Sequence, residues 1–304
     1  MNLYYNGVDI YKDVSVNYCV HEMFAEKQAD TLVIRFNDVK GIWSKWQPQA
    51  GDTIRFKEGA GDTGKMFLYS MKPENGLFTI RAMSLPRTAK TKKSKSWEGV
   101  RFLQLASEFA GNHGLGFKNY GCADQVYPYI QQNNESDFAF FSHLCMLEGC
   151  QMLVFDGSLL VYDERYLERQ APAGSLSVDE NGVFSYVDNR DRMYGSCEIA
   201  SGSFSGRYTA DSRSAVLRPQ VPLHVTSDAE AARFARGLLR NANKYGRTGQ
   251  FSKSLVTGYA AASLIKLTTK KASMWDGTVF VYKVRHDYGG NKTTIYFRDI
   301  LEGY

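Results

Sequence analysis

Cysteine is scarce in this sequence and odd in number, which argues against a framework of paired disulfides. The cysteines also lack the short repeated spacing that is typical of metal sites. We therefore expect reduced, mostly buried thiols in a protein made in a cytoplasm. The five residues are Cys19, Cys122, Cys145, Cys150 and Cys197.

Long hydrophobic runs are missing as well. No apolar stretch approaches the length of a membrane span, and Met1 to Tyr5 does not have the charged-then-apolar pattern of a signal peptide. We expect a soluble chain with no membrane insertion of its own, which would leave a cell only as part of a particle or after lysis.

Proline is rare, and strong charge of one sign is absent. The 19 tyrosines and 18 phenylalanines against 7 prolines favour strands, because aromatic side chains pack well on pleated surfaces. A net charge of +5 spread over 304 residues does not indicate a dedicated nucleic-acid binder. A chain of this length has room for two or three domains.

The first ninety residues have an all-β pattern. Short alternating or apolar runs at 31–36, 53–56, 66–69 and 77–81 are separated by glycine, aspartate, asparagine and proline. Strands at this spacing are typical of a small barrel or sandwich. We assign residues 1–90 to a first tube-like β-barrel domain.

A basic stretch follows, from Arg87 to Lys95, with no hydrophobic periodicity. We interpret it as a solvated linker or mobile loop. Contact with a nucleic-acid backbone is the alternative, but such sites normally add aromatic residues or an ordered element.

Residues 91–170 are predicted to form this basic linker and a small α+β domain. Helices are expected at 96–111, capped by Ser96, and at 135–148. The dipeptide Asp156-Gly157 between two apolar runs predicts a tight hairpin.

Residues 171–304 are predicted to form a second tube-like β-barrel domain with one helix at 227–244. Strands are expected at 182–187, at 261–267 and in a closing hairpin of 279–286 and 293–298. Ser227 and Glu230 form the pattern of a capping box. Phe234 and Leu238 are expected to pack the helix against its own barrel. Its basic face is expected to be solvated, with contact to an acidic surface as the less favoured alternative; the basic residues are Arg233, Arg236, Arg240 and Lys244.

Several motifs resemble catalytic or binding sites without meeting their requirements. Residues 59–66 nearly match a phosphate-binding loop, but Met66 cannot ligate magnesium and a strand, not a helix, is expected next. Ser203 and Ser205 are misplaced for a nucleophile elbow, and no pair of carboxylates stands out. The histidines lack metal spacing; they are His21, His113, His143, His224 and His286. We therefore predict no catalytic, cofactor-binding or metal-binding residues.

Four stretches, in order, resemble a known family. The first is the sequence at 29–38, Ala-Asp-Thr-Leu-Val-Ile-Arg-Phe-Asn-Asp, followed by Gly51-Asp52-Thr53-Ile54. The others are the stretch at 97–114 and the stretch at 134–141, which holds the pattern Glu-Ser-Asp-x-x-Phe, with Glu148-Gly149. The last is an end comprising 229–232, a strand containing Gly258, Trp275-Asp276-Gly277 and Val-x-His-x-Tyr-Gly-Gly at 284–290. Together they resemble the phage late-control protein D family, the central baseplate hubs of contractile tails, which are related to the hub part of type VI secretion spike proteins.

The resemblance implies a mainly β fold in which two tube-like β-barrel domains flank a small α+β domain. It also implies a homotrimer whose six barrels form a ring, joining the hexameric tail tube to a trimeric spike. The expected partners are the tail tube protein, the spike protein and other baseplate proteins, with DNA passing the channel without specific binding. The spike is expected to be a separate protein, because the sequence stops at Tyr304, directly after the last hairpin.

The particle implied by the resemblance is a phage, a prophage or a phage-tail-like bacteriocin (tailocin), with the chain made in the bacterial host cytoplasm and placed in the tail baseplate. Two alternatives remain open. One is a hub that also hydrolyses cell wall, which would need two carboxylates converging in a cleft of the α+β unit. The other is a nucleotide-dependent assembly factor that uses Gly59 to Lys65.

Overall fold

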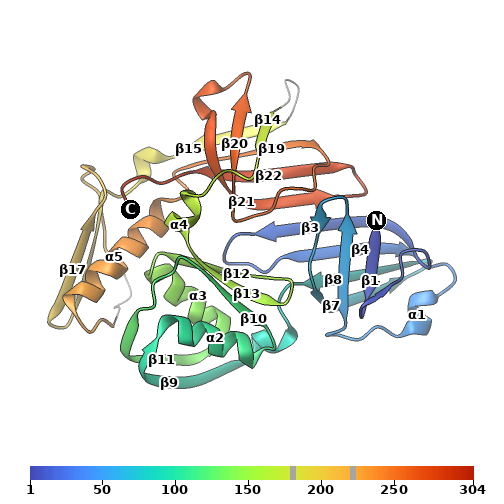
Figure 1. The fold of residues 1–304 in the computed structure, drawn as a ribbon, viewed down its shortest axis with the longest axis horizontal. Coiled ribbons are helices and arrows are strands. Elements are labelled where there is room, and N and C mark those ends of the chain that lie inside the picture. Colours follow the sequence, from blue (N-terminus) through green and yellow to red (C-terminus); the bar gives the residue numbers. More distant parts are fainter. Residues whose placement is uncertain (179–182, 220–223) are drawn as a thin grey trace.

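The computed structural model describes residues 1–178, 183–219 and 224–304, and strands dominate it (Figure 1). The largest sheet in the described residues has fourteen strands and includes both ends of the chain. Helices lie mainly between the two β-rich ends, so the expected mainly β fold with an α+β insertion is confirmed. No helix in these ranges is long and apolar enough to cross a membrane.

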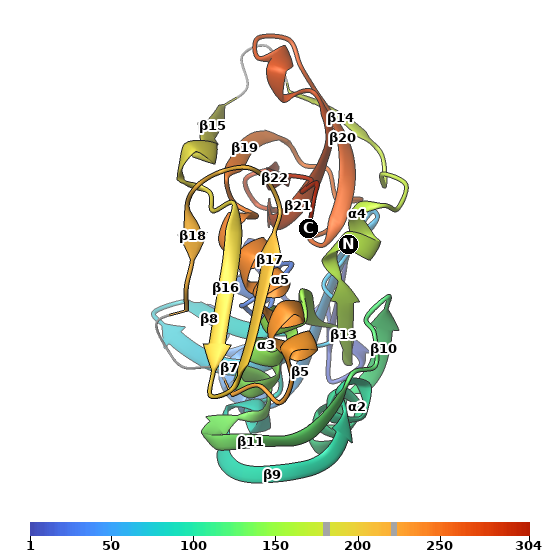
Figure 2. The same ribbon diagram turned by 90° about the vertical axis from the view of Figure 1, so that its left-hand side faces the viewer.

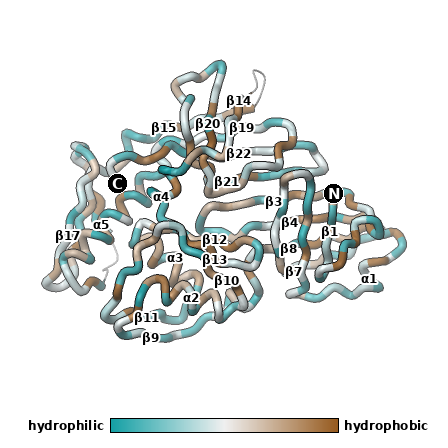
Figure 3. Tube along the Cα trace, viewed as in Figure 1, coloured by the Kyte–Doolittle hydropathy of each residue, from teal (hydrophilic) through white to brown (hydrophobic). Residues whose placement is uncertain are grey.

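The N-terminal module has the strands that the sequence predicts. Along β4, Leu32, Ile34 and Phe36 are buried while the residues between them are partly exposed. Figure 3 colours the chain, β4 included, by the hydropathy of its residues. Trp43 packs between Phe36 and Phe78 in the core of the module. The elements are β1 (Asn2–Tyr5), β2 (Val8–Asp9), β3 (Ser15–Phe24), β4 (Thr31–Asn37), α1 (Ile42–Trp46), β5 (Thr53–Glu58), β6 (Gly61–Asp62), β7 (Met66–Glu74) and β8 (Leu77–Met83).

The middle unit contains the helices α2 and α3, the short helix α4, a three-stranded sheet and a two-stranded ribbon (Figure 1). The predicted hairpin is present: Asp156 and Gly157 both have positive φ, as a tight type I′ turn requires. The elements are the 3-10 turn η1 (Arg87–Lys90), β9 (Lys92–Arg101), α2 (Phe102–Asn112), β10 (Gly116–Tyr120), β11 (Val126–Ser136), α3 (Asp137–Leu147), β12 (Cys150–Phe155), β13 (Ser158–Asp163) and α4 (Glu164–Glu168).

The basic segment 87–95 is ordered, and the linker interpretation was wrong. It forms η1 and the start of β9, which pairs antiparallel with β11. Two of its charges have acidic partners: Lys93 contacts Asp137 at 2.8 Å and Lys95 contacts Glu108 at 2.6 Å. Since β9 continues to Arg101, helix α2 begins at Phe102, later than the predicted start at 96, and Ser96 does not cap it.

The C-terminal part combines further strands of the large sheet with a small separate sheet and helix α5. Ser227 caps α5 as predicted by accepting from the Glu230 amide, while the Glu230 carboxylate accepts from Thr226. Position 182 of the predicted strand at 182–187 lies outside the described residues. The elements are β14 (Ser175–Val178), β15 (Phe184–Asp188), η2 (Arg190–Arg192), β16 (Ser196–Ser201), β17 (Phe204–Thr209), β18 (Val216–Leu217), α5 (Asp228–Asn243), β19 (Arg247–Ser254), β20 (Ser263–Thr269), η3 (Ser273–Trp275), β21 (Gly277–Asp287) and β22 (Lys292–Asp299).

Among the described residues, one strand pairing, between β3 and β21, joins the two β-rich ends into one sheet. The strand order is β15-β19-β22-β21-β3-β4-β8-β7-β5-β1-β2, with β6, β14 and β20 branching from it. The division into domains 1–90, 91–170 and 171–304, and the two closed barrels, stay predictions.

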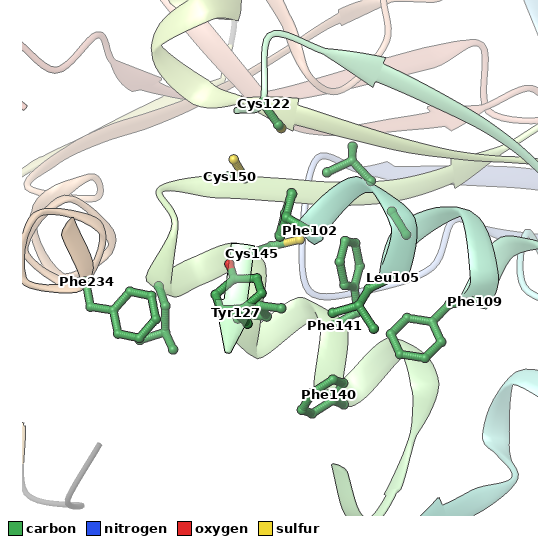
Figure 4. Close-up of a cluster of buried hydrophobic side chains, with 14 of the residues drawn as sticks. Phe102, Leu105, Phe109, Cys122, Tyr127, Phe140, Phe141, Cys145, Cys150 and Phe234 are labelled. Carbon is green, nitrogen blue, oxygen red and sulfur yellow. The ribbon is translucent and has the colours of Figure 1, made fainter. Parts of the chain in front are cut away.

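The largest apolar core joins the middle unit to α5. Phe102 of α2 stacks on Phe141 of α3 at 5.1 Å between ring centroids, and Phe234 of α5 belongs to the same cluster (Figure 4). Viewed from the side, α5 lies between the β16–β17 sheet and α3 (Figure 2). Helix α5 thus contacts both β16–β17 of the C-terminal part and α3 of the middle unit, and Phe234 and Leu238 pack in the core that these elements share. Packing of the helix on a closed second barrel stays a prediction.

Candidate functional site at the junction of the three units

Two histidines face each other in the pairing of β3 with β21, the seam that joins the two β-rich ends. In the antiparallel register of β3 and β21, His21 lies directly opposite His286. Such cross-strand neighbours have their side chains on the same face and in contact range. Both side chains are 1% exposed.

Each of these histidines is held uncharged by its surroundings. Burial, with the neighbouring His286, lowers the pKa of His21 to about 3, and burial also lowers the pKa of His286. His286 Nδ1 lies 2.9 Å from Thr293 Oγ1. The Nε2 atoms of both rings are buried without a hydrogen-bond partner in the described residues.

A cavity of about 430 Å³ opens beside the histidine pair, where all three units meet. The first module contributes polar side chains, the β12–β13 hairpin contributes apolar ones, and the 257–262 loop closes one side. The Tyr288 hydroxyl also lacks a hydrogen-bond partner among the described residues. The lining residues are His21, Met23, Phe24, Asp30, Ala60, Gly61, Asp62, Tyr120, Leu153, Phe155, Leu160, Tyr162, Leu167, Thr257 to Ala262, His286 and Tyr288.

Two carboxylates line this cavity, and their environments differ. Burial raises the pKa of Asp30 to about 7, against the backbone hydrogen bond from Phe24. Burial acts in the same direction on Asp62, but Arg55 and the Gly64 amide outweigh it and lower its pKa to about 2. The Asp62 oxygens are occupied at 2.6 Å by Arg55 and 3.1 Å by Lys57. Both carboxylates come from the first module, so they are not the convergent pair in the α+β unit that wall hydrolysis would need.

A buried network of opposite charges lies at the same junction. Arg240 of α5 contacts Glu164 at 2.9 Å and Glu168 at 2.6 Å. Arg298 of β22 contacts the same two carboxylates at 3.3 and 2.6 Å. Lys244 contacts Glu164 at 3.1 Å and also Glu26. The network thus ties α4, α5, β22 and the segment after β3 to one another.

Three acidic and three basic side chains balance in this network. Burial alone would raise the pKa of Glu164, but Lys244, Arg298 and Arg240 outweigh it and lower the pKa to about 2. Glu164 therefore stays charged at neutral pH, and all six side chains of the network are buried. Removing one partner would therefore leave a buried charge without compensation.

The basic face of α5 points inward, so the expectation of a solvated face was wrong. Arg233 contacts Glu148 at 2.7 Å, and Arg240 and Lys244 enter the buried network. The acidic groups that this face contacts belong to the same chain, namely Glu148 at the end of α3 and Glu164 and Glu168 of α4. Contact with an acidic surface of a partner stays a prediction.

The segment 59–66 has no phosphate-binding architecture. It forms the short strand β6 and the start of β7, and no helix follows. Gly64 instead packs on the β12–β13 turn, where Asp156 accepts from the Lys65 amide at 3.0 Å and from Arg55 at 3.2 Å. The segment that resembles a phosphate-binding loop therefore forms a contact between the first module and the middle unit.

The serines, histidines and cysteines considered as candidates from the sequence do not form a further site. Ser203 lies in the turn between β16 and β17, and Ser205 lies on β17. His143 and His224 are exposed, whereas His113 contacts Asp137 at 3.2 Å. All five cysteines are free and buried, as expected. No group of three metal-ligating side chains occurs in the part of the chain that the structure describes.

Sequence reasoning missed the histidine pair and the buried network. His286 lies within the motif that resembles the protein D family, but nothing local indicates that His21 is its partner. Charged residues within apolar strands, such as Arg298, and the Glu26 side chain beyond β3 were the only available signals.

Comparison with known proteins finds similar structures but no similar sequence. No family model and no curated protein matches this chain. A 43 kDa tail protein of prophage MuSo2 from Shewanella oneidensis matches with a TM-score of 0.75 and 11% identity, over 98% of this chain and 97% of that one. A tail protein from Neisseria meningitidis matches with a TM-score of 0.76 and 11% identity, over 98% and 95%.

A third similar structure is an Escherichia coli component of the type VI secretion system. It has a TM-score of 0.64 and 13% identity, and the match covers all of this chain and 79% of that one. The likeness extends over the whole chain, from the N-terminal module to the closing hairpin. This chain therefore has the fold of phage tail proteins and of a type VI secretion component, as its resemblance to the late-control protein D family predicts.

Proposed function

We propose that this chain is a structural baseplate hub protein of a contractile phage tail or phage-tail-like particle. Three copies would form a ring that joins the hexameric tail tube on one side to a separate trimeric spike on the other. The observation that supports this proposal most strongly is the structural match to a prophage tail protein, which covers 98% of this chain at a TM-score of 0.75.

The internal architecture supports a mechanical role. One sheet runs through both β-rich ends, which the pairing of β3 with β21 joins. The buried ion network lies at the same junction. The apolar core of the middle unit extends to α5. An adaptor has to hold its two ends in fixed relation while force passes through the particle, and these contacts fix that relation.

The chain is proposed to act as a building block and not as a catalyst. The cavity at the junction presents two neutral imidazoles, the Asp62 carboxylate, which two cations already hold, and Asp30, which accepts a hydrogen bond from the Phe24 amide. Partners would be the tube protein, the spike protein and other baseplate proteins, with DNA passing through without specific binding. The protein would be made in the host cytoplasm and end in the tail baseplate.

Electron microscopy of the purified full chain tests the ring directly. Class averages viewed down the particle axis should show threefold symmetry around an open centre. A closed centre filled by protein, or particles of single-chain size only, would contradict the adaptor role.

A further inference from the structure

A second cavity, separate from the junction cavity, lies between α5 and the end of α3. Its volume is about 170 Å³, which is enough for a small ion and a few waters. Four arginines and two acidic residues line it, so its wall carries an excess of two positive charges. The lining residues are Ala123, Gln125, Glu148, Gly149, Cys150, Asp163, Arg165, Arg233, Arg236, Gly237 and Arg240.

Two of the four arginines are neutralised within the wall itself. Arg233 Nε lies 2.7 Å from a Glu148 oxygen, and Arg165 Nη2 lies 3.1 Å from an Asp163 oxygen. These pairs use both acidic residues of the cavity. Arg240 is paired with Glu164 and Glu168 outside the cavity, so the charge left without an acidic partner among the described residues is that of Arg236.

Arg240 presents a buried donor without a partner. The side chain is 2% exposed, and its Nε and Nη2 contact Glu164 and Glu168, which do not line the cavity. Its Nη1 has no hydrogen-bond partner among the described residues. An unpaired guanidinium donor at a buried position is costly unless something fills its place.

Arg236 repeats this pattern one helical turn earlier on α5. Its guanidinium lies over the Tyr208 ring, 5.4 Å from the centroid, which fixes its orientation. Its Nε is buried and has no hydrogen-bond partner in the described residues. Residues four apart lie on one face of a helix, so both arginines reach the same cavity.

We propose that this cavity binds a small oxyanion between Arg236 and Arg240. Guanidinium groups match the charge and the planar donor geometry of phosphate, sulfate and carboxylate. A bound oxyanion would supply acceptors for the unpaired donors and offset the excess positive charge. It would also link α5 to the middle unit at a second point, beside the buried network.

Calorimetric titration of the full chain with inorganic phosphate, at constant ionic strength against chloride, tests the proposal. We expect saturable binding of one phosphate per chain and a melting temperature that rises with phosphate concentration. Sulfate and acetate, titrated in the same way, show whether a tetrahedral anion or a carboxylate fits better. No saturable binding of any of the three would overturn the proposal.

Variants identify the cavity as the place of binding. Arg236→Gln should weaken phosphate binding at least tenfold, and Arg236→Lys, which keeps the charge but not the fork of donors, should weaken it less. Arg101→Gln removes an exposed arginine elsewhere and should change nothing. Equal binding by wild type and Arg236→Gln would refute the site. If Arg236→Gln does not fold, phosphorus NMR of phosphate with wild type and Arg236→Lys decides: equal line broadening by both refutes the site.

Discussion

Arg298 is the residue on which the buried ion network depends most visibly, because it contacts two carboxylates from a fully buried position. Arg298→Met would keep much of the side-chain volume and leave Glu164 and Glu168 short of a counter-charge. We expect a loss of about 3–5 kcal/mol in the free energy of unfolding, measured by urea denaturation.

Arg101 provides the control for this change, since it makes one exposed ion pair with Asp124 at 3.2 Å. Arg101→Met should cost less than about 1 kcal/mol. Equal costs for the two substitutions would show that the network contributes no more than a surface pair.

His21 gives the stability a defined dependence on pH. Its pKa is about 3 in the folded chain, against about 6.5 in an unfolded one. Between these values the unfolded chain binds more protons, so this contribution is present above pH 6.5 and is lost as the pH falls toward 3. Asp30, with a pKa raised to about 7, acts in the opposite direction, and wild type alone would mix the two effects.

The difference between wild type and His21→Gln isolates the histidine. Between pH 7 and pH 5, wild type should lose about 2 kcal/mol more unfolding free energy than the variant. His143→Gln, on the exposed face of α3, should follow wild type. Parallel curves for wild type and His21→Gln would mean that His21 does not titrate abnormally in the fold.

At the scale of elements, the contact between the first module and the β12–β13 turn can be tested with matched glycines. Gly64 and Gly41 have nearly the same φ, 64° and 63°. A Cβ on Gly64 would lie 2.9 Å from the Asp156 amide nitrogen, whereas one on Gly41 meets nothing within 4 Å.

Gly41→Ala should therefore show only the cost of a left-handed alanine, about 1–2 kcal/mol. Gly64→Ala should add about 1–3 kcal/mol for the forced displacement of the turn. Thermal or urea unfolding measures both. If the two variants are equally stable, the turn is not packed against the first module as the structure has it.

Strand β9 can be tested by limited proteolysis. Its pairing with β11 should protect the lysines at 92–95 from trypsin, although they are mostly exposed. Lys40, in the turn before α1, provides the comparison. Cleavage within 92–95 before cleavage at Lys40 would restore the linker interpretation.

Elements with local signals were predicted well from the sequence. Short apolar runs predicted β4 and β8, and the Asp156-Gly157 pair predicted the β12–β13 turn. Ser227 predicted the start of α5. Strand β9 was missed because its own sequence is polar and its partner, β11, is distant along the chain. The face of α5 was misjudged because its partners are distant: Glu26 and Lys244 are 218 positions apart.

At the scale of the whole molecule, three sets of contacts join the two β-rich ends and the middle unit. The β3–β21 seam, the shared core of α3 and α5, and the buried ion network each join segments that are far apart in sequence. Such contacts suit the proposed adaptor, which would bear force from the tail tube and from the spike. The sequence alone predicted the order of the units but not these contacts, because each contact involves residues with no local pattern.

The mass of the purified chain in solution tests the central claim most directly. A baseplate hub should form a trimer, so light scattering or native mass spectrometry should give three times the 34.3 kDa of one chain, unchanged on dilution over the measurable range. A stable monomer at all concentrations, or a closed assembly whose chain number is not a multiple of three, would contradict the account.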